Sequence, residues 1–371
     1  MSLITLQPLA LAARVRLRIV VTAVALSAFS TLAAAQIVVK SDDTTFKFGF
    51  QGQLWADCTQ DPTGAQGYQQ NIYLRRARII MGGDIGKDLS FFVETDDPKL
   101  GLTPKNLTSG LLLQDALLEW RPSAVFQLVG GLFIVPFLRN GLQSTLTYIT
   151  LDVSAISTIT NGATQSSALR DTGFEAKGFF LKDHLLYRLG EFAGARDVNG
   201  HNPARTAGYV QYDFFTAEKG YLFNGTTLGM QRVLAVDAGV DRQGTYRGVS
   251  ANIAAALPLN GGDEIAGQFQ YVHYDGRTRF PAVSDQNDYL LEAGYYSRRL
   301  KTQPFLKFDD QSFVSSADAS KDVYRFGAGL NRYLHGQKLK WTLQYLRTSP
   351  QNTVSLKASS ELTIQLQLSY Y

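Results

Sequence analysis

The sequence is poor in cysteine and in charged residues. Cys58 is the only cysteine among 371 residues, so an internal disulfide framework is excluded. Charged residues make up 18% of the chain, below the roughly 25% of an average soluble protein. The formal net charge of +4 falls by three, to +1, when the three arginines of the leader described next are left out. Such a near-neutral chain gives no support to a nucleic-acid partner, and none is expected.

Long apolar runs are also scarce, and the clearest one lies near the N-terminus, from Ile19 to Leu32. Its flanks carry the charged and small residues of a leader: Arg14, Arg16 and Arg18 before it, and Ala33, Ala34 and Ala35 after it. The run is shorter than the roughly 20 residues that span a bilayer, which disfavours the alternative of a membrane anchor. The pattern predicts a secretory signal peptide over residues 1–35, cleaved before Gln36.

The rest of the chain alternates between apolar and polar residues. Between residues 45 and 57, Phe46, Phe48 and Phe50 fall on one face while Gln51 and Gln53 fall on the other. This period of two predicts amphipathic strands, and it recurs as far as the last segment, residues 361–370. The mean hydropathy of -0.09 agrees with this pattern, because the contributions of alternating apolar and polar residues cancel in any window average.

We count about 16 such strands of roughly 10 residues each, the size class of general porins. A soluble β-sandwich or propeller is the alternative, since its strands also alternate. Alternation over the full length, aromatic residues near strand ends and the leader favour a barrel in the outer membrane of a Gram-negative cell. In lipid, only a sheet that closes into a barrel gives the backbone groups of every strand a hydrogen-bonding partner. We therefore expect an all-β fold, a transmembrane antiparallel β-barrel over residues 36–371.

Residues 134–171 interrupt this rhythm over a length far beyond an ordinary hairpin loop. The segment contains Pro136 and a Ser/Thr-rich run from Ser144 to Ser167. A mobile external loop is one interpretation, but the segment carries many apolar residues: Tyr148, Ile149, Leu151, Val153, Ile156 and Ile159. We expect it to fold into the lumen as a constriction.

Arg75, Arg76 and Arg78 form the densest charge cluster of the alternating region. Arg76 and Arg78 share one face of a strand and Arg75 takes the other. An arginine on the lipid face at mid-bilayer costs roughly 2–4 kcal/mol. The favoured orientation of the strand therefore points two of the arginines inward and one outward. Arg75 then lies near the interface or at a bulge that turns it inward. The residues expected on the lipid side are Tyr73, Ala77, Ile79 and Met81.

Two roles are open for this cluster. Its arginines attract anions, as charged rings do in selective pores, or they pair with lumen carboxylates and form a neutral, rigid wall. The candidate carboxylates are Glu94, Asp96, Asp115 and Glu119. The same alternation places further basic residues on the wetted wall, each more typical of a wall residue than of a binding site: Arg188, Arg205, Lys307, Arg325 and Lys340.

Six short stretches of the chain stand out by their order and spacing: residues 46–49 (FKFG), 74–78 (LRRAR), 83–86 (GDIG), 92–94 (FVE), 114–120 (QDALLEW) and 129–137 (VGGLFIVPF). In these stretches the chain resembles the phosphate-selective porin O and P family. The resemblance covers most of the mature chain, but beyond about residue 200 only the strand pattern agrees.

The resemblance implies a 16-stranded, trimeric channel, and some members of the family favour phosphate through an arginine ladder. Arg75, Arg76 and Arg78 match that ladder, and Asp115 and Arg139 match positions near the constriction. The chain departs from the family in having Ile134 where a lysine usually precedes the Val-Pro-Phe motif. The C-terminus departs as well, because Tyr371 is one residue out of phase with the apolar face that ends on Tyr370.

Catalysis is not expected, because the four histidines are scattered and none lies in a catalytic motif. No cofactor or metal is expected either. We predict a passive diffusion channel for small hydrophilic solutes with a preference for anions such as phosphate. The alternatives are a non-selective or cation-leaning general porin, and a plugged structural or adhesion barrel.

Overall fold

The computed structural model describes residues 37–64, 67–102, 104–197, 202–351 and 357–371. The predicted leader, residues 1–35, lies outside this range. Among the residues described, no helix has both the length and the apolar character needed to cross a membrane.

Strands account for most of the described chain. In chain order the elements are β1 (Ile37–Ser41), β2 (Thr44–Gln60), β3 (Tyr68–Ile85), β4 (Leu89–Asp96), β5 (Leu112–Trp120), β6 (Gln127–Ile134), η1 (Ala155–Thr158), β7 (Arg170–Phe180), β8 (Leu185–Phe192), β9 (Arg205–Asp213), β10 (Val233–Gln243), β11 (Tyr246–Pro258), η2 (Asn260–Gly262), β12 (Glu264–Asp275), β13 (Gln286–Tyr296), β14 (Thr302–Phe313), η3 (Ala319–Lys321), β15 (Val323–His335), β16 (Leu339–Pro350) and β17 (Ser359–Tyr370). The η elements are single 3-10 turns.

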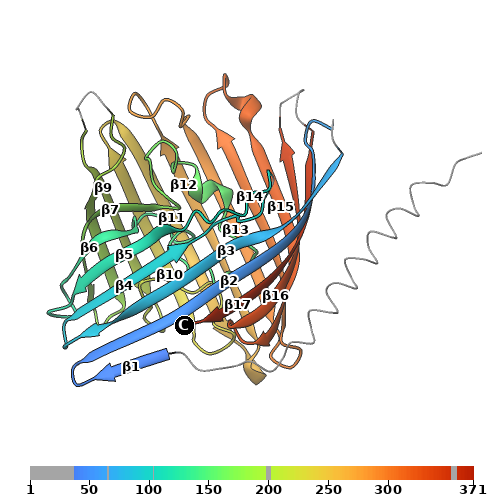
Figure 1. The fold of residues 1–371 in the computed structure, drawn as a ribbon. Helices are drawn as coiled ribbons and strands as arrows, with labels where there is room; N and C mark the ends of the chain where they lie inside the picture. The colour runs from blue at the N-terminus through green and yellow to red at the C-terminus, as the bar shows by residue number, and fades with distance from the viewer. Residues whose placement is uncertain (1–36, 65–66, 103, 198–201, 352–356) are drawn as a thin grey trace, which may run out of the picture. The chain divides into compact units, whose positions relative to one another are not determined.

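Strands β2 to β17 close into a ring of sixteen. Each pairs antiparallel with the next strand along the chain, and β17 pairs with β2, where Tyr370 lies opposite Phe50. Closure gives every strand a hydrogen-bonded neighbour on both sides, which lipid requires. The predicted all-β, 16-stranded antiparallel barrel is thus confirmed. β1 extends beyond the ring and pairs with the first residues of β2 (Figure 1).

The two faces of the strands differ as the alternation predicts. Outward side chains are apolar and exposed, among them Val240, Ile253, Phe269, Leu291 and Leu306. Inward side chains between them are polar and buried, among them Asp237, Asn252, Gln268, Glu292 and Lys307. The burial of these polar groups shows that the lumen is largely filled.

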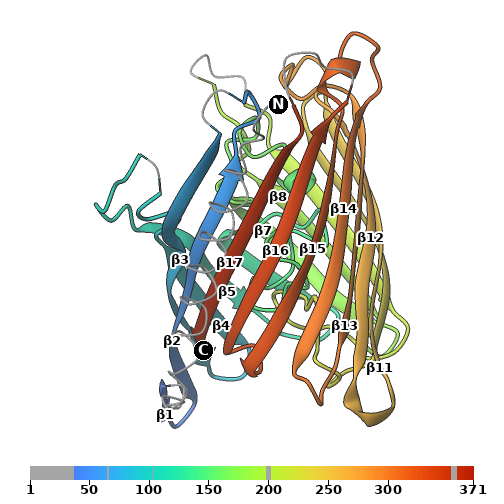
Figure 2. The ribbon, with the colours of Figure 1, turned by 90° about the vertical axis from the view of Figure 1, so that its right-hand side faces the viewer.

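The two rims of the barrel carry connections of different length. β1 and the C-terminus lie at one rim (Figures 1 and 2), and most connections there are short. The longest connection of the other rim runs from β6 to β7. Outer-membrane barrels have short periplasmic turns and long extracellular loops, so we assign the rim with β1 and the C-terminus to the periplasm. The β9–β10 connection, residues 214–232, is exceptionally long for that rim.

Residues 135–169, here called the lumen loop, lie inside the barrel. Wall side chains from many strands bond to this loop: Gln51 to Thr145 (2.9 Å), Ser250 to the Phe137 carbonyl (2.8 Å), Asn331 to the Ile149 carbonyl (2.7 Å) and Gln367 to the Leu146 carbonyl (3.2 Å). Its apolar residues Ile149, Leu151 and Ile156 are buried. Side chains from β2, β11, β15 and β17 therefore hold the lumen loop against the barrel wall at several points around the barrel.

Candidate functional site

Arg75 lies at a bulge in β3. Along the β2–β3 ladder Gln53 pairs with Arg76 and Leu54 with Leu74, so Arg75 is skipped. A bulge of this kind re-aims a side chain. It turns Arg75 inward, where the guanidinium lies 5.5 Å from the centre of the Trp55 ring. All three guanidiniums of the cluster therefore reach the lumen.

The same bulge overturns the expectation for Tyr73. We expected Tyr73 on the lipid side. Arg75 is the extra residue of the bulge, and it reverses the alternation of inward and outward side chains in the part of β3 that precedes it. Tyr73 is only 7% exposed and packs edge-on against Trp55, with ring centres 6.0 Å apart. Tyr73 thus faces the lumen.

Asp152 of the lumen loop pairs with the first two arginines. Its carboxylate lies 2.6 Å from Arg75 and 2.6 Å from Arg76, and Arg76 also donates to Gln53 at 2.6 Å. Burial alone would raise the pKa of Asp152, but the Arg76 and Arg75 guanidiniums outweigh it and hold this pKa well below its usual range. The loop is thus tied to β3 by an ionised carboxylate.

Arg78 and Arg170 extend the pairing along the wall. Arg78 contacts Glu94 and Asp96, each at 3.0 Å, and Arg170 contacts Asp115 at 2.9 Å. With its oxygen towards both guanidiniums, the Gln114 amide accepts from Arg78 (2.8 Å) and Arg170 (3.1 Å). Charge-assisted bonds of this kind fix the planes of the guanidiniums.

A chamber of about 330 Å³ adjoins the cluster on the extracellular side. Among the described residues that line it, five are basic and one is acidic: Arg75, Arg76, Arg78, Lys99 and Arg170 against Asp96. The other carboxylates of the network do not line this outer chamber. Basic side chains therefore outnumber acidic ones in the lining of the outer chamber.

A second chamber, also of about 330 Å³, lies on the periplasmic side. Its lining is rich in apolar and aromatic residues: Ile80, Phe91, Phe92, Leu117, Leu146, Tyr221, Leu222 and Tyr371. Three residues line this inner chamber and the outer one alike: Arg78, Thr145 and Leu222. These three residues lie where the two chambers adjoin.

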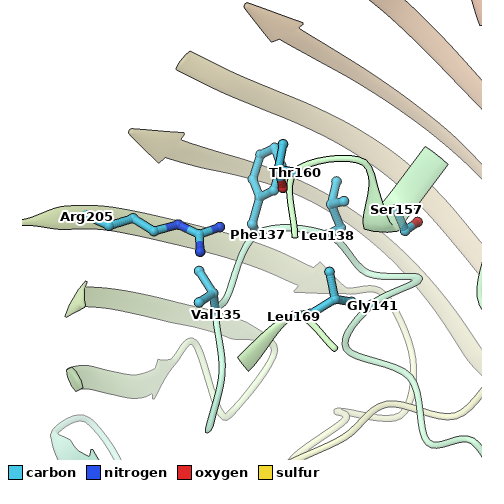
Figure 3. Close-up of a pocket in the computed structure, with 8 residues that line it drawn as sticks. All are labelled: Val135, Phe137, Leu138, Gly141, Ser157, Thr160, Leu169 and Arg205. Atoms are coloured by element: carbon cyan, nitrogen blue, oxygen red, sulfur yellow. The ribbon is translucent and has the colours of Figure 1, made fainter. Parts of the chain in front are cut away.

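The other predicted site residues lie away from the chambers, each in an ion pair. Arg139 pairs with Glu218 (2.6 Å), Arg188 with Glu175 (2.9 Å), Arg205 with Asp241 (2.6 Å) and Arg325 with Asp309 (2.9 Å). Burial alone would lower the pKa of Arg139, yet Glu218 raises it above its usual range. Arg205 extends towards the lumen loop beside a cavity of about 10 Å³, together with Val135 and Thr160 (Figure 3).

Sequence reasoning missed several residues of the site, among them Asp152, Arg170, Tyr221 and Leu222. Asp152 and Arg170 fall in or next to the irregular stretch, where alternation assigns no direction. Tyr221 and Leu222 belong to the β9–β10 connection, residues 214–232, here called the inner segment. The length of that connection was the available signal, since a turn at the periplasmic rim is normally short.

Ile134, which stands where the resembled family has a lysine, is buried at 2% exposure. It packs in an apolar cluster with Leu142 and Phe223, and it also borders the outer chamber. The inner segment supplies Phe223, so an isoleucine suits this place better than a cation does.

Within the described residues, no group of three or more His, Cys, Asp or Glu side chains could hold a metal ion.

Solved structures resemble the barrel over nearly its whole length. An anion-selective porin from Comamonas acidovorans is 13% identical, with a TM-score of 0.60 over 88% of this chain and 100% of that chain. OprB from Pseudomonas putida is 8% identical, with a TM-score of 0.62 over 88% and 94%. The trimer form of OmpT from Vibrio cholerae is 11% identical, with a TM-score of 0.56 over 89% and 100%.

Neither a protein-family model nor a curated protein matches the sequence. The resemblance to the phosphate-selective porin O and P family therefore rests on the motifs quoted above. At identities of 8–13% the likeness to solved structures is one of fold: the chain has the 16-stranded barrel architecture of outer-membrane porins.

Proposed function

We propose that the protein is a trimeric outer-membrane porin, a passive diffusion channel for small hydrophilic solutes with a preference for anions. A closed barrel with an apolar outer face and a polar inner face supports membrane insertion. The two chambers share Arg78, Thr145 and Leu222 in their linings, and the proposed passage for solutes runs between the chambers at this point. The trimer is proposed from the family resemblance and from the trimer form of the V. cholerae porin. Solutes move down their gradients without catalysis.

The lining of the outer chamber is the observation that carries the anion preference. Five basic side chains and one acidic side chain border it. A guanidinium has five N–H donors, so an arginine that holds a carboxylate on one side can still bind an anion on the other. Lumen charge of one sign is the usual basis of pore selectivity.

The carboxylates behind the guanidiniums limit this preference. Asp152, Glu94 and Asp115 each contact an arginine of the chamber wall, so the wall as a whole is close to neutral. The proposal is therefore a moderate anion preference in which phosphate is one of several permeant anions. Strict phosphate selectivity would need more uncompensated cationic charge.

The test is the reversal potential of the refolded protein in planar bilayers under a potassium chloride gradient. The wild type should give an anion-signed potential. In the double variant Arg76→Ala and Arg78→Ala, the carboxylates Asp152, Glu94 and Asp96 lose guanidinium partners. At about 1 kcal/mol for a unit charge 4 Å away in water, the ratio of anion to cation permeability should fall about five-fold or more.

Arg325→Gln is the matched control, because Arg325 lies on the wall away from both chambers and Asp309 keeps Ser154 as a partner at 3.0 Å. It should leave the reversal potential unchanged. A cation-signed wild-type potential would instead identify a cation-leaning porin. Complete absence of conductance would identify a plugged barrel. This outcome needs testing because side chains and the lumen loop fill much of the lumen.

A further inference from the structure

The inner segment enters the barrel from the periplasmic rim and joins the lumen loop. The Phe223 N–H donates to the Leu142 carbonyl and the Ser144 N–H donates to the Phe223 carbonyl, both at 2.9 Å. The Thr226 N–H donates to the Thr147 carbonyl at 3.1 Å. Two chain segments from opposite rims thus form a short backbone ladder within the lumen.

Polar anchors hold the inner segment in place. The Tyr221 hydroxyl donates to Asp115 at 2.7 Å and accepts from the Ile134 N–H at 3.0 Å. Glu218 is paired with the buried Arg139 at 2.6 Å. Removing one partner of a buried ion pair is strongly unfavourable, so these contacts keep Leu222 at the passage.

Aromatic rings line the inner chamber next to Leu222. Phe92 packs against Tyr221 and Tyr371, with ring centres 5.7 Å and 6.2 Å away. Phe92 and Tyr371 both lie in the lining of the inner chamber, so neither belongs to the apolar outer face. Gly82 makes room for this arrangement, because a Cβ there would lie 2.5 Å from the Tyr371 hydroxyl.

From this arrangement we propose that the preferred solutes are organic anions with an apolar body, with aromatic carboxylates as the representative class. The carboxylate contacts the guanidiniums of the outer chamber and Arg78. The apolar body contacts Leu222 and the rings of Phe92, Tyr221 and Tyr371. Leu222 and Phe92 are the residues that determine this specificity.

The physical basis is that the two chambers offer different contacts along one path. Arginine forms paired hydrogen bonds with a carboxylate, whereas aromatic rings favour offset or edge-on contacts with another ring. An inorganic anion uses only the first kind of contact. Binding must stay weak for transport, and partly exposed rings at a wet passage meet that condition.

The proposal rests on the anion-preferring pore proposed above, and one set of recordings separates the two. Chloride current through the wild-type protein is measured while benzoate, acetate or phosphate is added at neutral pH. Benzoate and acetate carry the same charge and differ in the ring. Benzoate should reduce the current by half at a concentration about five-fold lower than acetate, which corresponds to one ring contact.

In Leu222→Asn and in Phe92→Thr, the concentration of benzoate that halves the chloride current should rise close to that of acetate. The reversal potential should stay anion-signed in both variants. The control is Leu346→Asn, which makes the same change as Leu222→Asn on the inner wall of β16, outside both chambers. This variant should keep the wild-type difference between the half-blocking concentrations of benzoate and acetate.

Equal block by benzoate and acetate in the wild type, with an anion-signed potential, would overturn the organic-anion proposal and leave the porin proposal intact. Stronger block by phosphate than by benzoate would do the same. A cation-signed potential would overturn both. If one variant does not refold, the wild-type comparison and the other variant still decide.

Discussion

Asp152 shows how a single residue sets both the charge and the shape of the pore. Its carboxylate neutralises part of the arginine cluster and at the same time fastens the lumen loop to β3. The charge of the outer chamber therefore depends on a loop residue as much as on the wall.

Asp152→Asn should raise the preference for anions. The amide keeps an oxygen that can accept from Arg76, but the negative charge behind the two guanidiniums is lost. One unit charge at this distance corresponds to about a five-fold change in the ratio of anion to cation permeability. Reversal potentials in a salt gradient measure it.

Asp275→Asn is the control, because Asp275 pairs with Arg277 in an exposed position, outside both chambers. An unchanged potential in Asp152→Asn would show that this carboxylate does not contribute to the field in the pore.

The pH dependence of Asp152 follows from its lowered pKa. The usual value is 3.8, so the ion pairs contribute their full stability above pH 3.8, and this contribution is lost only as the pH falls through the lower pKa of the folded state. The difference in reversal potential between wild type and Asp152→Asn should therefore persist from pH 7 to pH 4. Convergence of the two proteins at pH 5 would contradict the assignment.

At the scale of elements, the seam between β17 and β2 is where the barrel closes. Gly49 lies in β2 beside the last residues of the chain, and a Cβ there would be 2.2 Å from the Tyr370 carbonyl oxygen and 2.6 Å from the Cβ of Tyr371. The glycine thus lets the C-terminal residues pass close to β2.

Gly49→Ala should destabilise the barrel by about 1–3 kcal/mol, the usual range for overpacking. The added methyl group meets backbone, which cannot move aside without shifting β17. The measurement is the free energy of unfolding in urea of the protein refolded into vesicles. Gly162→Ala is the control, since a Cβ at Gly162 has no neighbour within 4 Å. Equal stability of both variants would show that β17 tolerates the displacement.

The two lumen segments are elements of a different kind, because each is held by side chains rather than by a full ladder. The lumen loop was recognisable in the sequence from its broken alternation. The inner segment was not recognised in the sequence. The length of residues 214–232 is a signal of an unusual connection, but it does not tell whether the segment folds into the lumen.

For the whole molecule, the proposed trimer and the proposed leader can be tested together. The protein purified from outer membranes in a mild detergent should elute at about three times the mass of one barrel. Its intact mass in denaturing conditions should correspond to a chain that begins at Gln36. Boiling in detergent, which separates the protomers, is the control. A monomer under all mild conditions, or a chain that retains residues 1–35, would contradict the respective proposal.

By itself the sequence determined the barrel and the direction of most side chains. A period of two assigns each residue to a face, and lipid around an apolar face demands a closed ring. Arg76 and Arg78 therefore had to point inward, and Arg75 needed either a position near the interface or a bulge. These conclusions are local, and they hold wherever a strand keeps its phase. The prediction for Tyr73 was wrong because the bulge at Arg75 interrupts the alternation of β3 beside it.

Only the tertiary structure decided which charges meet and what fills the lumen. The pairs of Arg76 with Asp152 and of Tyr221 with Asp115 join residues 76 and 106 positions apart, and no local pattern encodes such contacts. The aromatic lining of the inner chamber needs β4, the C-terminus and the inner segment at one place. Their meeting follows from the closure of the ring, which places β17 beside β2.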